Sequence, residues 1–429
     1  MALSTHRRWR LTALFLLYAA QGAPEGLLYI AVPAWLVAQG ATAAEIGSYI
    51  AIILLPWSLK FINGLLMDRF AFPAMGRRRP WLLAAQFALV LTLVAISLQG
   101  PSANLVVTMT IIGFCVNLAG AFQDVAIDGM AIDIVPEHER ARANGVMWGG
   151  KTLGISGGAI VTGMLISHLG LAAAALASAA FVSLVFLFPL FLRERPGERL
   201  FPWSRGDASV EAGPRPASRF KDIARALLTV LIRPQSLLFA LGLFLAMISY
   251  GLHTAFGPVM AVKRLAWTTE AYSTLAGAAN LVGGLFGLVL SGFIADRLGP
   301  TRTVVIAVGG MAALQAALAV VPGYWSAQGV FAGFILLHSV LFVLLSVALY
   351  ASAMGLCQPL VAATQFSIYM AILNLGTSAG AHNFGGVLDR LDYGGVLLTG
   401  AAFCAASMLV FLVVESRSRA AAAAPAGRP

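Results

Sequence analysis

Long apolar runs dominate this chain, and each is long enough to cross a lipid bilayer. Of the 429 residues, 59% are hydrophobic and 11% are charged, and the mean hydropathy is +0.85. A soluble domain has about 25% charged residues, and a membrane-spanning helix needs about 20 apolar ones. The composition therefore predicts an all-α polytopic membrane protein and excludes a soluble globular one.

Twelve runs have the length and hydropathy of a membrane span. They lie near residues 11–38, 45–66, 80–99, 103–133, 143–167, 170–192, 236–262, 270–293, 302–321, 327–353, 361–388 and 393–414. The segment between the sixth and seventh runs is rich in proline and charge, which is typical of a linker. We expect an N-terminal six-helix bundle, a flexible cytoplasmic linker, a C-terminal six-helix bundle and a disordered cytoplasmic tail, over residues 1–192, 193–235, 236–416 and 417–429.

The basic residues indicate the orientation of these spans. With the N-terminus inside, 23 of the 28 Lys and Arg residues fall in cytoplasmic segments, three fall outside and two lie within spans. Cytoplasmic loops of membrane proteins carry such an excess of basic residues. We therefore expect both termini to be cytoplasmic. The same pattern accounts for the net charge of +10 without a nucleic-acid partner.

Enzyme and metal-site signatures do not stand out in the sequence. The three cysteines, Cys115, Cys357 and Cys404, lie in separate apolar runs, so they suggest neither a disulfide framework nor a metal site. No His and Cys residues have the spacing of zinc ligands, and no phosphate-binding loop of the ATPase type occurs. We expect no metal, no cofactor and no enzymatic activity.

The run near 103–133 carries two acids where hydrocarbon is expected. A buried charge costs about 3 kcal/mol on insertion scales. Because a helix turns by about 100° per residue, Asp124 and Asp128 share one face with Asn117. That face must turn toward protein or water rather than lipid. Asp124 is a candidate for proton coupling or, alternatively, part of a structural ion-pair cluster, and Asp128 fits the structural role better.

The first span carries a further acid near its middle. Glu25 shares a helical face with Gln21 and Tyr29. A carboxyl at this depth suits the binding and release of a proton, so Glu25 is the first candidate for coupling. A structural carboxyl bonded to a neighbour is the alternative.

Other deep polar residues are candidates for the path of a transported solute. Lys60 and Lys151 lie at a depth similar to that of the two aspartates, so a neutral buried network is expected. The second half has no deep acid or lysine, and His253 lies 228 residues after Glu25. A buried histidine with a packing role is the alternative there. The predicted pathway residues are Gln21, Tyr29, Asn117, Lys60, Lys151, His253, Asn280, Gln365, His382 and Asn383.

Two loops that follow the second and eighth spans carry the same motif, 228 residues apart. They read Gly64-xxx-Asp68-Arg69, followed by Gly76-Arg77-Arg78-Arg79, and Gly292-xxx-Asp296-Arg297-x-Gly299-xx-Arg302. An acid and a base at a helix end suit a pair that locks a cytoplasmic gate, although arginines here also satisfy topology alone. The predicted gate residues are Asp68, Arg69, Arg77, Asp296, Arg297 and Arg302, and the predicted structural charge network is Asp128, Asp133 and Arg140.

The twelve spans, the central linker and the repeated loop motif together resemble the major facilitator superfamily. Further residues narrow this resemblance: Pro56-Trp57-Ser58-Leu59-Lys60-Phe61, Met67-Asp68-Arg69, Gly76 to Trp81, Gln123-Asp124 with Asp128, Asp133-x-x-Pro136-Glu137-x-x-Arg140 and Ala363-Thr364-Gln365. These residues resemble those of AmpG-like permeases, a branch that includes muropeptide importers, siderophore permeases and acetyl-CoA carriers. Glu25, and Lys151 in place of an arginine, are departures from the muropeptide type.

The resemblance implies two pseudo-symmetric six-helix halves with a solute site near the midplane and alternating access. It implies a bacterial inner-membrane permease, expected as a monomer, for a polar solute of the muropeptide or siderophore type. The deep acids Glu25 and Asp124 add the expectation that uptake is coupled to protons. The partners would then be a small-molecule solute, protons and the lipid bilayer. An exporter or antiporter, a uniporter, and a receptor or scaffold without transport are the alternatives. The absence of a proline beside Gly157 and Gly158 favours uptake.

Overall fold

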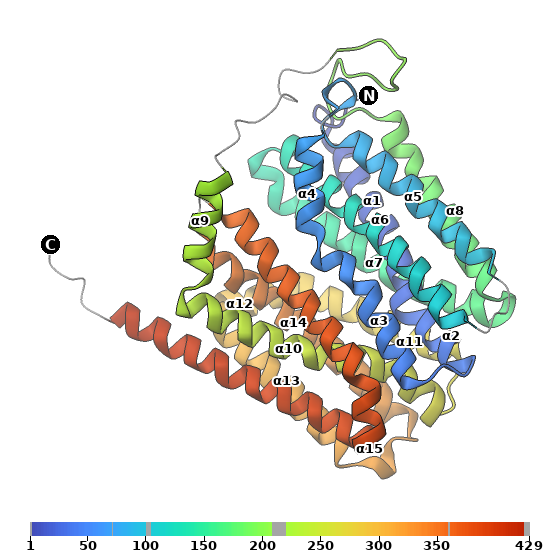
Figure 1. The fold of residues 1–429 in the computed structure, drawn as a ribbon, viewed down its shortest axis with the longest axis vertical. Coiled ribbons are helices and arrows are strands. Elements are labelled where there is room, and N and C mark those ends of the chain that lie inside the picture. The colour runs from blue at the N-terminus through green and yellow to red at the C-terminus, as the bar shows by residue number, and fades with distance from the viewer. Residues whose placement is uncertain (1, 71, 100–103, 208–219, 359–360, 424–429) are drawn as a thin grey trace. The chain divides into compact units, whose positions relative to one another are not determined.

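The computed structural model describes residues 2–70, 72–99, 104–207, 220–358 and 361–423, and these are almost entirely helical (Figure 1). Eleven helical segments among them are long and apolar enough to cross a membrane. Ten match expected spans one to one, and the last, Thr364–Arg417, contains the remaining two. Its backbone leaves the helical region at Asp392, where φ is 62°. The predicted all-α polytopic fold class is confirmed.

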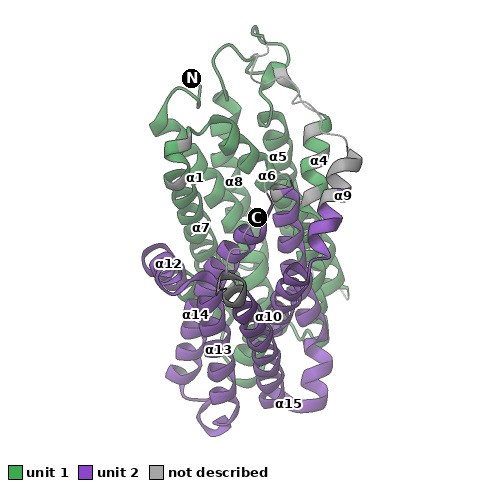
Figure 2. Ribbon diagram, turned by 90° about the vertical axis from the view of Figure 1, so that its left-hand side faces the viewer, with its two compact units in different colours: residues 1–216, 257–281 green, residues 217–256, 282–429 purple. Residues whose placement is uncertain are grey.

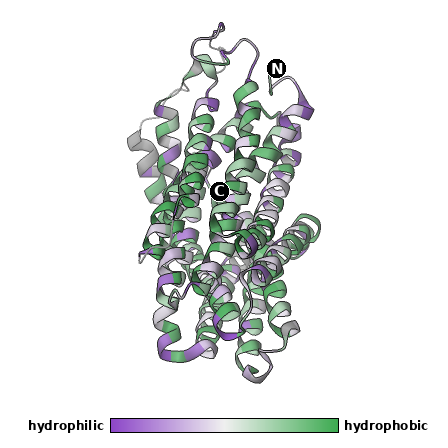
Figure 3. Cartoon of the chain, turned by 90° about the vertical axis from the view of Figure 1, so that its right-hand side faces the viewer, coloured by the Kyte–Doolittle hydropathy of each residue, from purple (hydrophilic) through white to green (hydrophobic). Residues whose placement is uncertain are grey.

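The first compact unit comprises residues 1–216 and 257–281 (Figure 2). Hydrophilic residues gather at helix ends and in the connecting segments, whereas the helices are mostly hydrophobic (Figure 3). The elements of this unit are α1 (Arg7–Gly26), η1 (Leu27–Ala31), α2 (Val32–Ala38), α3 (Ala43–Ser58), α4 (Lys60–Arg69), η2 (Pro73–Met75), α5 (Arg79–Ser97), α6 (Leu105–Ile134), η3 (Glu137–Glu139), α7 (Arg140–Leu169), α8 (Leu171–Phe191), η5 (Met260–Arg264) and most of α11 (Thr269–Phe286).

The second compact unit comprises residues 217–256 and 282–429. Its core includes Phe239, which packs edge-on against Tyr369 and Phe411 with ring centroids 5.0 and 5.8 Å apart. Its elements are α9 (Phe220–Leu231), most of α10 (Pro234–Val259), η6 (Gly287–Ser291), α12 (Gly292–Leu298), α13 (Pro300–Ala319), η7 (Pro322–Tyr324), α14 (Gln328–Leu356) and α15 (Ala362–Ala423).

Helices α1 and α7 pack backbone to backbone because small residues line their contact. A methyl group on Gly154 would lie 2.3 Å from the Ala19 carbonyl oxygen, and one on Gly158 would lie 2.4 Å from the Ala23 carbonyl oxygen. Such faces let membrane helices approach closely. This contact brings side chains of the first and fifth spans together near Glu25.

The first span is irregular close to Glu25. Pro24 has no backbone N–H to donate within α1, and the helix then continues as the π-helical turn η1 before α2 begins. π-Turns inside helices occur frequently at functional sites. The candidate acid therefore lies next to a break in regular helical hydrogen bonding.

The predicted linker and tail include described residues with regular contacts. Backbone hydrogen bonds join Leu3 to Arg193, Ser4 to Glu194 and Arg199 to Ala74 within the first unit, α9 is helical, and α15 continues to Ala423. Residues 208–219 of the linker and 424–429 of the tail lie outside the described part of the chain.

Candidate functional site

Asp124 lies at the centre of a polar network inside the first unit. Its side chain is buried on α6 between α1 and α4. The Gln21 Nε2 group donates a hydrogen bond to Asp124 Oδ1 at 2.9 Å, and Lys60 Nζ contacts Asp124 Oδ2 at 2.9 Å. The Asp124 carboxylate thus has a cation on one oxygen and an amide donor on the other, which offsets part of the cost of burying its charge.

Asp128 lies one turn along the same face of α6 and has a different partner. The Tyr18 hydroxyl on α1 donates a hydrogen bond to Asp128 Oδ1. The adjacent contact between α1 and α6 is made by Gln123 Nε2, which donates to the Leu17 carbonyl oxygen at 3.0 Å. Asp128 is therefore hydrogen-bonded to a neutral hydroxyl, whereas Asp124 is paired with a cation.

Glu25 and Lys151 form the second ion pair of the network. Lys151 Nζ on α7 lies 3.1 Å from Glu25 Oε1 on α1, and the two side chains are 16% and 12% exposed. The ammonium group also lies 4.9 Å from the centroid of the Trp57 ring on α3, within the range of a cation–π interaction. Lys151 is thus held by a carboxylate and an aromatic face.

Tyr29, Trp57 and Asn117 form a neutral hydrogen-bonded group on three elements of the same unit. The Tyr29 hydroxyl donates to Asn117 Oδ1, and Trp57 Nε1 donates to the same oxygen at 2.7 Å. Asn117 Nδ2 donates in turn to the Gly113 carbonyl oxygen at 2.9 Å. Because Trp57 contacts both this group and Lys151, it connects the neutral group to the ion pairs.

The predicted stripe on α6 is thus brought together with the polar face of α1, but the pairing differs from the expected one. We expected the two lysines to balance the two aspartates. The structure instead pairs Lys60 with Asp124 and Lys151 with Glu25. The reason is the close backbone contact between α1 and α7, which places Lys151 beside the first span.

In the second unit, His253 lies in a stack of rings. The centroids of the His253 and His338 rings are 3.4 Å apart, and the two ring planes differ by 14°. Tyr250 stacks on Phe342 at 3.6 Å beside them. His253 Nδ1 and His338 Nε2 have no hydrogen-bond partner within the described residues. His253 therefore lies in a neutral aromatic environment, unlike Glu25, its counterpart by sequence offset.

Two further predicted pathway residues, Asn280 and Gln365, are hydrogen-bonded to neighbouring residues. In the first unit, Asn280 Nδ2 donates to Ser156 Oγ at 3.0 Å. Gln365 is fully buried in the second unit, where its Nε2 group donates to the Tyr369 hydroxyl at 3.0 Å and its Oε1 atom accepts from the Gln358 backbone N–H. Gln365 thus anchors the start of α15.

His382 and Asn383 are exposed on α15, and the amide of Asn383 donates to the Ala379 carbonyl oxygen at 2.8 Å. This bond lies within the turn of its own helix. The described contacts of these two residues are separate from the ion-pair network.

The predicted gate residues have varied surroundings. Arg69, Asp296 and Arg297 are exposed, and the Arg297 guanidinium lies 6.0 Å from the Phe293 ring centroid. Arg302 pairs with Glu415 at 2.8 Å. The side chain of Asp68 lies outside the described residues.

Arg77 and the predicted structural residues Asp133 and Arg140 lie near the opposite end of the helices from η1. Arg140 is exposed, whereas Arg78 Nε lies 3.9 Å from Asp133 Oδ2. The backbone N–H of Arg77 donates to Glu194 Oε2 at 3.0 Å.

Sequence reasoning missed Glu194 altogether, together with the pair formed by Arg10 and Glu139 at 2.5 Å. That Arg10 contact lowers the pKa of Glu139. A run of mixed charge at the end of a span, such as Arg193-Glu194-Arg195, is typical of a solvent-exposed surface. The burial of Glu194 could therefore not be predicted from the sequence.

Comparison with known proteins gives a consistent family assignment. The family model described as Major Facilitator Superfamily matches residues 14–381. The anhydromuropeptide permease of Escherichia coli (strain K12) is 31% identical over 154 residues, which cover 35% of this chain and 30% of that protein. The putative transporter AmpG 4 of Rickettsia felis is 26% identical over 150 residues, 34% of this chain and 36% of that protein. The chain thus matches about a third of the length of these relatives.

Solved structures share the fold at low sequence identity. The nucleoside transporter NupG has a TM-score of 0.70 at 14% identity, covering 97% of this chain and 99% of that one. A POT family transporter in complex with a thioalcohol-conjugated peptide has a TM-score of 0.71 at 13% identity, covering 95% and 96%. These matches confirm the expected major facilitator fold, and the AmpG-like resemblance is confirmed by the named relatives. The chain belongs to the major facilitator superfamily and is a multi-pass membrane protein.

Proposed function

We propose that this protein takes up a polar small solute together with protons, by alternating access. The observation that carries the proposal is the pair of buried ion pairs, Glu25 with Lys151 and Lys60 with Asp124, on four helices of one unit. Ionisable residues inside membrane spans are expensive and mark ion or solute pathways. The printed name of the Escherichia coli relative supports a muropeptide-like solute, and a siderophore-like solute is the second candidate.

The coupling step follows from the chemistry of the Glu25–Lys151 pair. Protonation of the Glu25 carboxyl removes the negative partner of Lys151 and leaves a cation in an apolar interior, which is strongly unfavourable. An anionic or hydrogen-bond-accepting group of the solute can replace that partner. Proton binding and solute binding at this pair therefore favour each other, which is the requirement for symport.

Asp124 has the second role in this scheme. Its carboxylate already has two donors, Gln21 and Lys60, so it is more firmly held than Glu25. We assign Glu25 as the first proton-coupling residue and Asp124 as the second. Tyr29, Trp57 and Asn117 supply aromatic faces and an amide beside the pairs, and such groups suit a polar, uncharged part of a solute.

The orientation in the membrane, the cellular location and the monomeric state belong to the same proposal. The basic residues favour cytoplasmic termini, and the bacterial relatives favour an inner-membrane location. A monomer, with six-helix halves over residues 1–192 and 236–416, is the simplest assembly that fits the fold.

Uptake by proteoliposomes with an imposed inward proton gradient tests the proposal. The wild type and Glu25→Gln would be offered labelled anhydromuropeptide and a panel of siderophores. We expect gradient-driven accumulation of one of these by the wild type, its collapse with an uncoupler, and its loss in the variant. Full accumulation by Glu25→Gln would contradict the coupling role, and efflux from preloaded vesicles without uptake would identify an exporter.

A further inference from the structure

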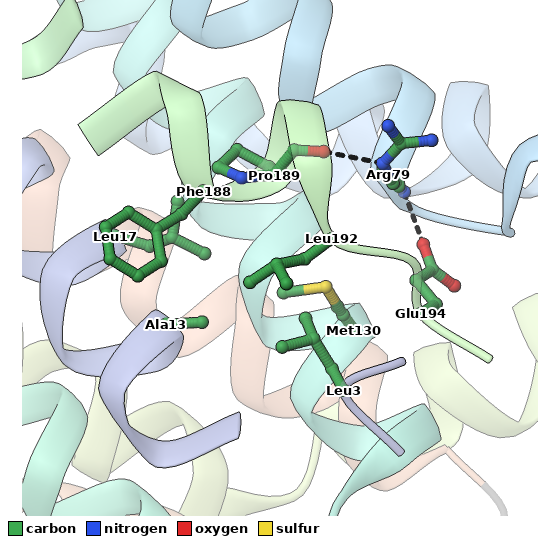
Figure 4. A pocket seen from close by; sticks show the side chains of 9 residues that line it. All are labelled: Leu3, Ala13, Leu17, Arg79, Met130, Phe188, Pro189, Leu192 and Glu194. Atoms are coloured by element: carbon green, nitrogen blue, oxygen red, sulfur yellow. Dashed lines mark hydrogen bonds between the residues drawn. The ribbon is translucent and has the colours of Figure 1, made fainter. Parts of the chain in front are cut away.

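A buried carboxylate joins the start of the linker to the loop that follows α4. Glu194 is 0% exposed, and its side chain accepts hydrogen bonds from three consecutive backbone N–H groups. Arg77 donates at 3.0 Å, Arg78 donates at 2.7 Å, and Arg79 donates to the same oxygen as Arg78. Figure 4 shows the bond between Arg79 and Glu194. Three aligned amides are a strong site for a carboxylate.

Backbone hydrogen bonds hold the same linker residues from two further sides. The Leu3 N–H donates to the Arg193 carbonyl oxygen at 2.8 Å, and the Ser4 N–H donates to the Glu194 carbonyl oxygen at 3.0 Å. The Arg199 N–H donates to the Ala74 carbonyl oxygen at 2.7 Å. The start of the linker is therefore fixed between the N-terminal segment and the loop.

The side chain of Arg79 makes the same connection in the reverse direction. Its Nε atom donates to the Pro189 carbonyl oxygen at 2.6 Å, and a terminal nitrogen donates to the Leu190 carbonyl oxygen at 2.7 Å. Both acceptors lie in the last turn of α8, beside the small cavity that Leu17, Arg79 and Glu194 help to line (Figure 4). Arg79 thus holds the end of α8, directly before the linker begins, while Glu194 of the linker holds the backbone of the loop.

We propose that Glu194 is a positioning residue that docks the linker onto the loop between α4 and α5 and so holds the ends of these two spans in place. We call residues 72–79 and 193–199 the latch. The loop contains the Gly-Arg-Arg-Arg part of the repeated motif, so release of the latch would free the gate loop of the transporter. The proposal does not depend on the identity of the solute or on proton coupling.

The latch responds to pH through a second carboxyl. Glu198 is 1% exposed, and its Oε2 atom accepts from the Arg195 backbone N–H at 2.9 Å. Burial, assisted by the nearby charge of Glu194, raises the pKa of Glu198 to about 7. Burial also raises the pKa of Glu194, although its three amide donors oppose that shift. The charged groups that face these carboxyls are Arg77, Arg78, Arg79, Arg193, Arg195, Arg199 and Asp133.

The sign of the pH effect follows from the raised pKa of Glu198. A carboxyl whose pKa is raised in the docked state binds its proton more tightly there than in the released state. Docking is therefore strongest when Glu198 is protonated and weakens as the pH rises through about 7. Loosening of the latch is the expected response as the pH on the side where the linker lies rises to about 7, and the effect levels off above that pH.

Hydrogen exchange of the full-length protein in nanodiscs tests the latch without any solute. Protection factors, corrected for the intrinsic effect of pH on exchange, would be measured for residues 74–79 and 193–199. In the wild type we expect protection to fall as the pH rises through about 7. Glu194→Gln should reduce protection in both segments by about tenfold or more, since the amide cannot accept three N–H bonds equally well.

Two matched variants separate docking from general stability. Glu198→Gln should keep the protection that the wild type has at low pH and lose its pH dependence. Glu415→Gln, which alters the Arg302 pair in the second unit, should leave both segments unchanged. If Glu194→Gln is not monodisperse and helical, Glu194→Asp provides the shortened carboxylate in its place. Unchanged protection in the Glu194 variant, or the same pH profile in Glu198→Gln as in the wild type, would overturn the proposal.

Discussion

The interiors of the two units bury polar groups in different ways. The first unit pairs charged side chains on its spans, Glu25 against Lys151 and Lys60 against Asp124. In the described part of the second unit, the buried polar groups on the spans are neutral in character. Ser249, Gln315 and Cys404 form one cluster, in which Gln315 Nε2 donates to Ser249 Oγ at 3.0 Å.

In both units, however, a glycine lets one helix pack directly against the backbone of another. Gly154 on α7 lies against the Ala19 carbonyl of α1, and Gly380 on α15 lies against the Ile248 carbonyl of α10. A methyl group on Gly380 would lie 2.0 Å from that oxygen. Similar close helix contacts thus lie beside buried ion pairs in the first unit and beside neutral polar side chains in the second unit. Proton-dependent chemistry is accordingly expected from the first unit.

The largest expected effect comes from breaking an ion pair of the first unit. Asp124→Leu leaves Lys60 without its carboxylate, and loss of one partner of a buried pair costs about 3–5 kcal/mol. We expect a large decrease in the thermal unfolding temperature, followed by circular dichroism in detergent. The double variant Lys60→Met/Asp124→Leu should recover most of the loss. A single variant as stable as the wild type would show that the pair contributes little.

These glycine contacts can be tested in both units together. Gly154→Val and Gly380→Val should each destabilise the protein by about 1–3 kcal/mol, because a side chain would meet the facing backbone. Gly157→Val on α7 is the matched control, since nothing lies within 4 Å of a methyl group there. If only one of the two glycine variants lowers the unfolding temperature, the units do not use the same contact.

These contacts also show what the sequence could predict. Hydropathy located the spans because each must supply about 20 apolar residues. The helical period placed Asn117, Asp124 and Asp128 on one face, and the structure gives that face polar partners. Both predictions depend only on the geometry of one helix.

Partners on different helices could not be predicted in the same way. The pairing of Lys151 with Glu25 depends on how two distant spans pack. Gln365 bonds the Gln358 backbone and Tyr369, and these partners depend on how the chain folds between α14 and α15. Glu194 read as a surface charge because its three amide donors lie more than a hundred residues earlier in the chain. Burial of a charge is visible only once the tertiary contacts are known.

The smallest expected effect concerns the neutral cluster of the second unit. Ser249→Ala removes the acceptor of the Gln315 amide and of the Cys404 thiol, which lies 3.1 Å away. Loss of a neutral hydrogen bond costs about 0.5–1.5 kcal/mol. Ser416→Ala, at an exposed site, is the control for the unfolding measurement. A loss as large as that of Asp124→Leu would remove the distinction between the two interiors.

The proposed symport depends most directly on Glu25 as the site where protons and solute are linked. Solute exchange across the membrane without a gradient needs binding and alternating access but no net proton movement. The decisive measurement compares equilibrium counterflow with gradient-driven accumulation for Glu25→Gln, using the solute that the wild type takes up. If Glu25 couples protons to the solute, the variant retains counterflow and loses accumulation. Accumulation at the wild-type level would show that Glu25 does not couple them.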